Sequence, residues 1–405
     1  MYTIVAILSF RGNGQALQLS ELGAYLPGSA REPAKTKRVQ RLLMSKKWSK
    51  SVLEVFLWRR ADREVQRMKA AGERPLCIWD GSVLEKGESE KSEGISSVLS
   101  SRAKRLKKHK KGNFNQRGGK PITVLGMEWT GVIVVGMQGI PHIVKMVWWS
   151  RKGEKATKQQ RVEEALLRTI SREWRQAVLH VFDRGYGSGP WLETLERCYV
   201  LFVIRWKKGH HFCDENGNEL PLSQLVGRTR SKWHKKLWNF QKRCLMKTGV
   251  VVKRVRHAKY AGDLWVVAVR QKGEPWYLIT NVPIETEQEA WECVFAYRGR
   301  WKIETCFRYG KSELRLETVC IQEQEKREKM LVLVMTVYMF LLWLMHEQQR
   351  EIVVWLLQHY CHRTGKKQRE HLFPVYRVRW AISRYWLKYP PSFSFTALGD
   401  SPKLD

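Results

Sequence analysis

Residues 296–317, AYRGRWKIETCFRYGKSELRLE, contain no proline and carry apolar residues at helical spacing, a pattern that predicts a helix. With a rotation of about 100° per residue, one stripe of this helix carries four polar side chains: Tyr297, Arg300, Glu304 and Lys311. Trp301 and Arg308 border the stripe and are further candidate DNA-binding residues. An apolar stripe beside it is suited to packing on a core: Ile303, Phe307 and Leu314. A lone carboxylate among cations indicates a metal ligand surrounded by phosphate-binding groups. A solvated helix face with charge pairs one or two turns apart would carry the same residues.

The spacing Tyr297-x2-Arg300-x3-Glu304-x6-Lys311 resembles the Y-x2-R-x3-E-x6-K signature of DDE transposases of the IS-four family of bacterial insertion sequences. The resemblance implies that Glu304 is the third catalytic carboxylate. It also implies that Tyr297, Arg300 and Lys311 hold DNA phosphates near the cut. Two aspartates should then lie upstream, each at the end of a strand.

Two upstream aspartates answer this expectation. The apolar run at residues 76–79 ends at Asp80, which predicts a buried strand with an aspartate at its carboxyl end. Residues 178–182 form a second apolar run, which ends at Asp183 in front of a glycine-rich turn. An aspartate after a strand is by itself usually part of a turn. In the resemblance these are the first two catalytic positions, although Ser82 stands where many family members have threonine.

The order of the expected elements indicates the fold class. After the strand at 76–79 we expect, in order, two or three strands within 122–150, a helix at 156–172, the strand at 178–182, a helix at 191–198 and a strand at 199–206. Core spacing in the first of these helices predicts four buried residues: Val162, Ala165, Leu166 and Ile170. This is the layout of an RNase H-like core, an α/β fold with a mixed central sheet.

Five regions follow from this layout. We expect a helical basic DNA-binding region at 1–72, the first part of the core at 73–206, a β-rich insertion at 207–289, the catalytic helix and second part of the core at 290–350, and a basic and aromatic region at 351–405. Members of the IS-four family carry a β-rich insertion at the position of residues 207–289. The resemblance implies that Trp276 in this insertion stacks on a flipped base and that Trp301 fills the vacated space, whereas an ordinary strand aromatic is the simpler interpretation of Trp276.

The charge of the chain indicates a polyanionic partner. Lys and Arg number 73 against 39 Asp and Glu, which gives a net charge of +34. Such an excess most often means nucleic acid, with a ribosomal-type protein or a membrane-surface binder as alternatives. Two amphipathic helices after Pro33 carry a cationic set, and residues 102–120 are a candidate phosphate-tracking loop. The set comprises Arg38, Arg41, Lys46, Lys47 and Lys50. Solvated surface remains the alternative for both.

Three further features of the sequence concern the redox environment, zinc binding and membrane insertion. The eight cysteines are scattered, which suits a reducing cytosol. A zinc site is not favoured, because no second ligand pair follows the nearest group: His210, His211, Cys213 and Asp214. The uncharged run at 330–345 is slightly short for a membrane span and predicts a buried helix.

The chemistry implied by the resemblance is metal-dependent cleavage of DNA. Asp80, Asp183 and Glu304 would hold two Mg²⁺ ions about 3.5–4 Å apart, with Mn²⁺ able to substitute. Water would nick the transposon end, and the freed 3′-OH would form an end hairpin before strand transfer. The expected partners are transposon-end inverted repeats and target DNA, bound by a homodimer in a cytoplasmic, nucleoid-associated setting. A domesticated nuclease that does not integrate, and a non-catalytic DNA-binding protein, remain alternatives.

Overall fold

The computed structural model describes residues 2–10, 16–86, 91–100, 122–239, 243–361 and 375–391. The predicted phosphate-tracking loop at 102–120 lies outside these ranges, as does part of the C-terminal region. The chain divides into two compact units. We call residues 55–90 and 94–308 the sheet unit, and residues 1–54, 91–93 and 309–405 the helical unit.

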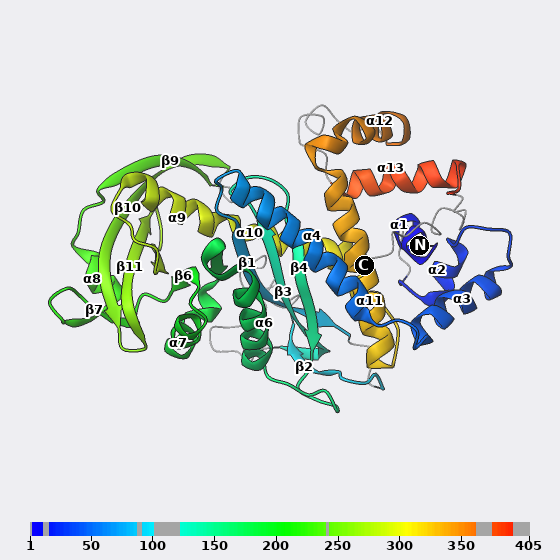
Figure 1. Ribbon diagram of the computed structural model, residues 1–405, viewed down its shortest axis with the longest axis horizontal. Coiled ribbons are helices and arrows are strands. Elements are labelled where there is room, and N and C mark those ends of the chain that lie inside the picture. Colours follow the sequence, from blue (N-terminus) through cyan, green and yellow to red (C-terminus); the bar gives the residue numbers. More distant parts are fainter. Residues whose placement is uncertain are drawn as a thin grey trace, which may run out of the picture. The chain divides into compact units, whose positions relative to one another are not determined.

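Five strands of the sheet unit form the core of its sheet (Figure 1). They lie in the order β4 (His142–Trp149), β3 (Thr123–Val135), β1 (Leu76–Glu85), β5 (Leu179–Phe182) and β6 (Leu201–Trp206). Strand β3 pairs antiparallel with both β4 and β1, whereas β1, β5 and β6 run parallel to one another. This sheet confirms the predicted α/β fold with a mixed central sheet.

The β-rich insertion extends this same sheet rather than forming a separate one. Strand β12 pairs with β6, and the sheet continues through β11, β10, β7 and β8, while β9 pairs with β10. The added strands are β7 (His211–Cys213), β8 (Glu219–Pro221), β9 (Trp233–Asn239), β10 (Cys244–His257), β11 (Tyr260–Arg270) and β12 (Trp276–Thr280). Strand β2 (Ser96–Leu99), which pairs with β3, was not predicted because its surroundings are polar and rich in glycine.

Helices cover both faces of the core strands. Helices α4 (Lys50–Ala70), α6 (Gln159–Trp174) and α7 (Gly189–Arg197) share a buried core with one face of the sheet. Helix α9 (Glu287–Gly299) contacts β1, β5, β6, β11 and β12. Alternate residues of β1 serve the two sides, because Trp79 belongs to the first core whereas Ile78 lies under Gly299 at the end of α9. The short helix α8 spans Leu222–Gly227.

Helix α6 begins three residues later than expected. Of the four predicted core residues, Ile170 is buried, Leu166 packs partly buried on the core, Val162 is partly buried and Ala165 is exposed, whereas Glu163 is buried. A carboxylate can occupy this inward position because Tyr186 and Gln159 both donate hydrogen bonds to it. The amphipathic pattern could not reveal this, since it counts every glutamate as a surface residue.

The helix expected at 296–317 consists of two helices. Helix α9 ends at Gly299, Arg300 forms a turn, and α10 spans Trp301–Ser312. Glycine is a poor helix former, which explains the position of the break. Helix α10 ends early because the chain turns at its C-terminus, where Leu314 donates to the Tyr309 carbonyl and Arg315 has a left-handed φ of 57°. The predicted apolar stripe is nonetheless buried throughout.

The helical unit confirms the predicted helical character of both ends of the chain. Its helices are α1 (Tyr2–Ser9), α2 (Leu19–Ala24), α3 (Glu32–Met44), α11 (Gln324–Leu344), α12 (Arg350–Tyr360) and α13 (Val375–Lys388). Buried Arg379 of α13 joins this unit by donating to the carbonyls of Ile7, Leu8 and Phe10. Lys50 of the predicted cationic set pairs with Glu328 at 2.5 Å, so it also serves packing.

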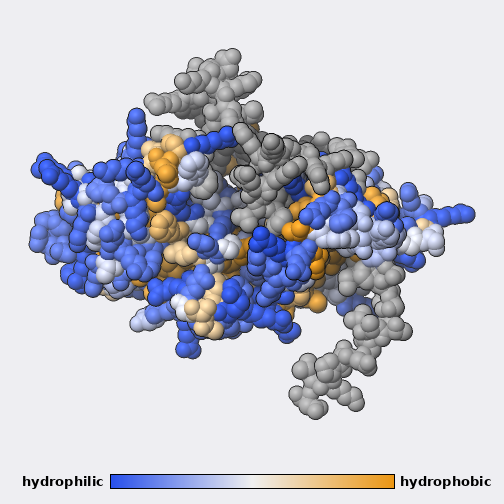
Figure 2. All heavy atoms as spheres, turned by 90° about the horizontal axis from the view of Figure 1, so that it is seen from above, coloured by the Kyte–Doolittle hydropathy of each residue, from blue (hydrophilic) through white to orange (hydrophobic). Residues whose placement is uncertain are grey.

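Helix α11 is buried along nearly its whole length, as predicted, and contacts α1, α3 and α13. No single helix in the described ranges has the length and apolar character needed to cross a membrane, although α11 and residues 347–360, bent by 82°, pass that test as a pair. Hydrophilic side chains make up most of the coloured surface in Figure 2.

Candidate active site

Asp80 and Asp183 leave neighbouring parallel strands at the same level. Strand β1 pairs with β5 up to Ile78 opposite Val181, and each aspartate follows two residues later. The prediction that Asp80 ends its strand is wrong, because β1 continues to Glu85 along β3, with Asp80 opposite Gly131. Asp80 instead marks the place where the parallel pairing ends and the two strands part. Asp183 follows β5 directly, as predicted.

Local hydrogen bonds hold both aspartates. Asp183 caps the short 3-10 helix η2 (Arg184–Tyr186), since its Oδ1 accepts from the Gly185 N–H at 2.6 Å. Asp80 Oδ1 accepts from the Gly81 N–H at 2.8 Å. Each carboxylate therefore keeps its second oxygen for another partner.

Arg300 joins the first aspartate to the helix glutamate. Its Nη1 donates to Asp80 Oδ2 at 2.8 Å and its Nη2 donates to Glu304 Oε1 at 2.5 Å. The Arg300 side chain is 10 % exposed, and the side chains of Asp80 and Glu304 are 13 % and 36 % exposed. Burial alone would lower the pKa of Arg300, but Asp80, Tyr297 and Glu304 raise it above its ordinary value. The guanidinium is therefore a firmly charged bridge between the two carboxylates.

The three carboxylates influence one another electrostatically. The pKa of Asp80 is raised to about 7, mainly by burial; the positive charge of Arg300 opposes this shift, and the charges of Asp183 and Glu304 contribute to it. Two neighbouring negative charges thus act on a buried carboxyl whose only strong compensation within the described structure is one guanidinium. Such a site favours additional positive charge.

The donors fit a divalent metal by their chemistry. Carboxylate oxygens are the ligands that hard divalent cations prefer, and Arg300 stands where a cation is needed between Asp80 and Glu304. Among the described residues, however, no three His, Cys, Asp or Glu side chains are close enough to form a ready-made metal site. A metal ion between Asp80 and Glu304 would therefore have to replace the bridging guanidinium.

Tyr297 and Trp276 lie together beside Arg205 of β6. The Trp276 and Tyr297 rings meet edge to face at 5.7 Å between centroids, and the Arg205 guanidinium lies 5.7 Å from the Trp276 ring. Burial raises the pKa of Tyr297, whereas Arg300 and Arg205 lower it. Trp276 is half-buried, and its neighbour Tyr277 is buried in the core on the other face of β12, as strand alternation predicts.

The other predicted residues of α10 have different surroundings. Trp301 is 56 % exposed, and the Arg300 guanidinium lies 5.5 Å from its ring centroid. Arg308 is exposed. Lys311 is buried and lies 3.8 Å from Glu317 within the helical unit.

Gly131 allows α10 to approach the sheet next to Asp80. A Cβ atom at Gly131 would lie 2.8 Å from two ring atoms of Phe307 and 3.0 Å from the Met146 sulfur. Phe307 also packs edge to face on Trp129 at 4.6 Å. Gly131 pairs with Asp80 in the ladder, and Phe307 lies on α10 with Glu304. This contact therefore joins the helix that carries Glu304 to the strand next to Asp80.

Sequence reasoning missed a fourth carboxylate, Glu163. Its Oε1 accepts from the Tyr186 hydroxyl at 2.8 Å and from the Gln159 amide at 2.9 Å. The pKa of Glu163 is raised to about 7, mainly by burial; the two hydrogen bonds oppose this shift, and the charge of Asp183 adds to it. The sequence signal that could have indicated a buried carboxylate here is Tyr186, an aromatic residue three positions after Asp183, because a buried tyrosine hydroxyl needs a hydrogen-bond partner.

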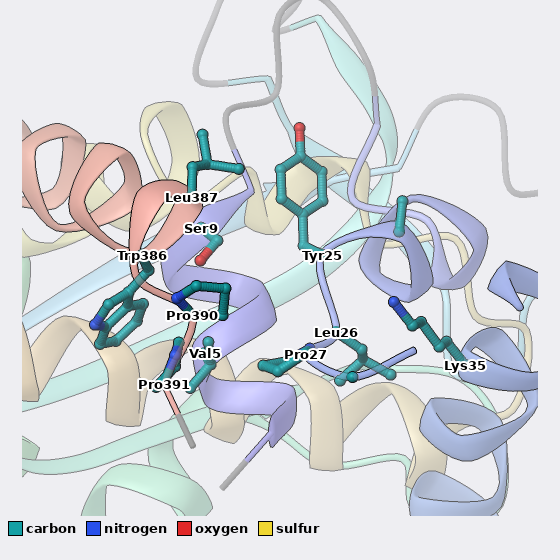
Figure 3. Close-up of a pocket in the computed structure, with 12 residues that line it drawn as sticks. Val5, Ser9, Tyr25, Leu26, Pro27, Lys35, Trp386, Leu387, Pro390 and Pro391 are labelled. Carbon is teal, nitrogen blue, oxygen red and sulfur yellow. The ribbon is translucent and has the colours of Figure 1, made fainter. Parts of the chain in front are cut away.

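Two other places in the described structure lack a cluster of carboxylates like that of the candidate site. The group His210, His211, Cys213 and Asp214 does not form a metal cluster in the described structure. A cavity of about 300 Å³ in the helical unit is lined mainly by apolar residues and prolines, together with the hydroxyl-bearing Ser9 and Tyr25 and the charged Lys35 (Figure 3). It offers no carboxylate among its lining residues, so the carboxylates of the sheet unit remain the candidate active site.

Part of the chain matches a known protein family. Residues 146–340, just under half of the chain, match the model of the transposase DDE domain, a range that contains Asp183 and Glu304 and begins after Asp80. No curated protein matches the chain. Among solved structures, it is similar to a piggyBac transposase synaptic complex with hairpin DNA, with 12 % sequence identity and a TM-score of 0.38 over 81 % of this chain. The match spans 55 % of that protein's length.

Proposed function

We propose that this chain, which matches the transposase DDE domain at residues 146–340, is a DNA transposase of the IS-four type. It cuts transposon ends in a metal-dependent reaction and joins them to target DNA. The observation that supports the proposal is the arrangement of three carboxylates: Asp80 and Asp183 each follow the last paired positions of adjacent parallel strands by two residues, and Arg300 links Glu304 to Asp80.

Asp80, Asp183 and Glu304 are the residues that would hold the metal, and Mg²⁺ fits their oxygen donors. A divalent metal bound there would supply activation of the attacking oxygen and stabilisation of the leaving oxygen of the scissile phosphate. Arg300, once displaced from the two carboxylates, would neutralise that phosphate. Tyr297 would add a hydrogen bond, and Lys311 would neutralise a phosphate further along the strand.

We further propose that cleavage proceeds through a hairpin at the transposon end, in a homodimer assembled on DNA. Trp276, half-buried beside Tyr297 and Arg205, is suited to receive a base that leaves the stack. The exposed ring of Trp301 is free to enter the space that the base vacates. The net charge of +34 supports DNA as the partner and a nucleoid-associated location.

The test uses a labelled duplex that carries the inverted repeats flanking the coding sequence. Asp80→Ala, Asp183→Ala and Glu304→Ala should each abolish cleavage in Mg²⁺ while retaining DNA binding. The matched control is Glu173→Ala, which removes an exposed carboxylate at the end of α6 and should cut normally. A variant of the three that cuts at the wild-type rate is not part of the site.

The same assay separates the alternatives. A wild-type chain that binds the ends but never cuts them is a DNA-binding protein that keeps the fold. A chain that cuts but does not join the ends to a target plasmid is a nuclease. Joined products with intact transposon ends are the outcome that the proposal requires.

A further inference from the structure

Strand β9 and the first half of β10 form a ladder with one face open to solvent. The pairing sets His234 opposite Gly249, Lys236 opposite Lys247 and Trp238 opposite Leu245. Residues opposite each other in a ladder share a face, and alternate residues of a strand do so too. We call this set the outer ladder face: His234, Lys236, Trp238, Leu245 and Lys247. All five side chains are exposed.

The opposite face of β9 already has a structural role. Leu237 is buried, and the Lys235 ammonium lies 5.3 Å from the ring of Trp291 on α9. Packing of this ladder on the sheet unit therefore uses the alternate residues. The outer ladder face is not needed for that packing.

Two lysines stand directly opposite each other on the outer ladder face. Like charges at opposed positions destabilise a ladder, because the Cβ atoms are only about 5 Å apart. Neither Lys236 nor Lys247 forms an ion pair within the part of the chain that the structure describes. An anion placed between them would remove the repulsion, so the arrangement suits a phosphate-bearing partner.

The neighbouring pair adds an apolar surface beside the two charges. Trp238 is 45 % exposed and Leu245 is 61 % exposed, and they lie opposite each other one step along the ladder. Cations next to an aromatic ring are the combination by which proteins hold nucleic acid, with phosphates on the cations and a sugar or base on the ring. An acidic peptide would use the lysines but would not need the ring.

A hydrogen bond ties this ladder to the helix junction of the candidate site. Arg298 Nη2 donates to the Trp238 carbonyl at 2.7 Å. Arg298 lies two residues before Arg300, which bridges Asp80 and Glu304. DNA bound on the outer ladder face would therefore contact strand β9, which this hydrogen bond connects to the last turn of α9, next to Arg300.

We propose that the outer ladder face is a DNA-binding surface of this chain, an inference that rests on the proposed function. Lys236 and Lys247 each neutralise one phosphate of neighbouring nucleotides. Trp238 and Leu245 pack against the sugar or base beside those phosphates. DNA bound there keeps a fixed position relative to the turn that contains Arg300.

The experiment measures binding of a fluorescein-labelled end duplex by anisotropy at several salt concentrations, in EDTA so that nothing is cut. The double variant Lys236→Gln/Lys247→Gln should lower the salt slope of log K by about 2 and weaken binding about tenfold or more near 0.1 M salt. Its melting temperature should equal or exceed that of the wild type, because the opposed charges are gone. Trp238→Ala should weaken binding with little change in the salt slope.

The matched control is Lys69→Gln/Lys272→Gln, which removes two exposed lysines elsewhere in the sheet unit. Equal affinity and salt slope for the two double variants would overturn the proposal while leaving the proposed function intact. A changed oligomeric state with unchanged DNA affinity would also overturn it, since the face would then bind another copy of the chain. A wild-type chain that binds no DNA would overturn both this proposal and the proposed function.

Discussion

Asp80 and Asp183 stand at the same level of two parallel strands, each two residues past the last paired positions, Ile78 and Val181. The strands part there because β1 continues along β3 while β5 turns into the 3-10 helix that Asp183 caps. Both aspartates therefore follow the point at which the two strands separate. Metal binding by their carboxylates can be measured without any cleavage.

We expect Mg²⁺ or Mn²⁺ to raise the melting temperature of the wild type, because the ion binds the folded carboxylates and not the unfolded chain. At a metal concentration of 100 times Kd the stabilisation is about 2.7 kcal/mol. Asp80→Asn should abolish the rise, whereas Glu173→Gln on the exposed end of α6 should retain it. An equal rise for Asp80→Asn would place the metal elsewhere.

If the proposed function holds, Arg300 competes with metal for the carboxylate oxygens of Asp80 and Glu304. Arg300→Gln removes the guanidinium that bridges Asp80 and Glu304, so the metal-dependent rise in melting temperature should occur at a lower Mn²⁺ concentration. Cleavage of an end duplex should nevertheless fall, because the cation intended for the phosphate is lost. Unchanged metal dependence in thermal melts would show that the bridge does not cover the metal site.

Gly131 sets the approach of α10 to the sheet. Gly131→Ala places a methyl group 2.8 Å from the Phe307 ring, so the ring and α10 must shift. We expect a loss of about 1–3 kcal/mol in the free energy of unfolding and reduced cleavage, because Glu304 moves with the helix. Gly227→Ala, where a Cβ atom meets nothing within 4 Å, is the control. Phe307→Leu should restore part of the loss if the clash with the ring is its cause.

The sequence predicts which residues form the candidate site better than it predicts the structure around them. Apolar runs ending at Asp80 and Asp183 place the aspartates on strands because strand burial appears directly in composition. The extent of β1 was missed, since pairing with a strand as distant as β3 decides it. The break at Arg300 was missed as well, because the helical periodicity continues across it.

Glu163 shows a different limit. Periodicity assigns charged residues to the surface, and only the folded chain brings the Tyr186 hydroxyl and the Gln159 amide to this carboxylate. The Arg300 bridge belongs to the same class, since a four-residue spacing permits the contact with Glu304 but cannot reveal the one with Asp80. Contacts between elements distant in sequence are what spacing rules leave out.

Glu163 predicts a pH dependence of stability. Its pKa is raised from 4.5 to about 7, so the folded chain keeps a proton that the unfolded chain loses between these values. Stability is therefore full below pH 4.5 and falls as pH rises to about 7, by on the order of 3 kcal/mol. Glu163→Gln keeps an oxygen for both donors and cannot ionise.

The variant should accordingly melt at the wild-type temperature at pH 4.5 and a few degrees higher at pH 8. Thermal melts of both proteins across this range give the difference directly. Glu164→Gln, which alters the next residue on the more exposed side of α6, should show no such trend. A difference between wild type and Glu163→Gln that does not change with pH would mean that Glu163 does not titrate in this window.

Trp276 tests the proposed hairpin step. A hairpin needs a tight turn at the DNA end, and stacked bases resist it, so one base should leave the stack. Stacking of that base on an aromatic ring offsets about 1–3 kcal/mol of the free energy needed to unstack it. Trp276 is half-buried against Tyr297 and Arg205, with part of its ring still accessible. Trp276→Ala should therefore reduce hairpin formation more than the first nick, and Trp276→Phe should restore part of it.

The assay resolves nicked and hairpin products of a labelled duplex on a denaturing gel. Tyr277→Phe is the control, because Tyr277 points into the core on the opposite face of β12 and should leave both products unchanged. The ratio of hairpin to nick decides the matter, since a general loss of folding would reduce both products together. A wild-type ratio for Trp276→Ala would make Trp276 a packing partner of Tyr297 and leave the flipped base without a platform there.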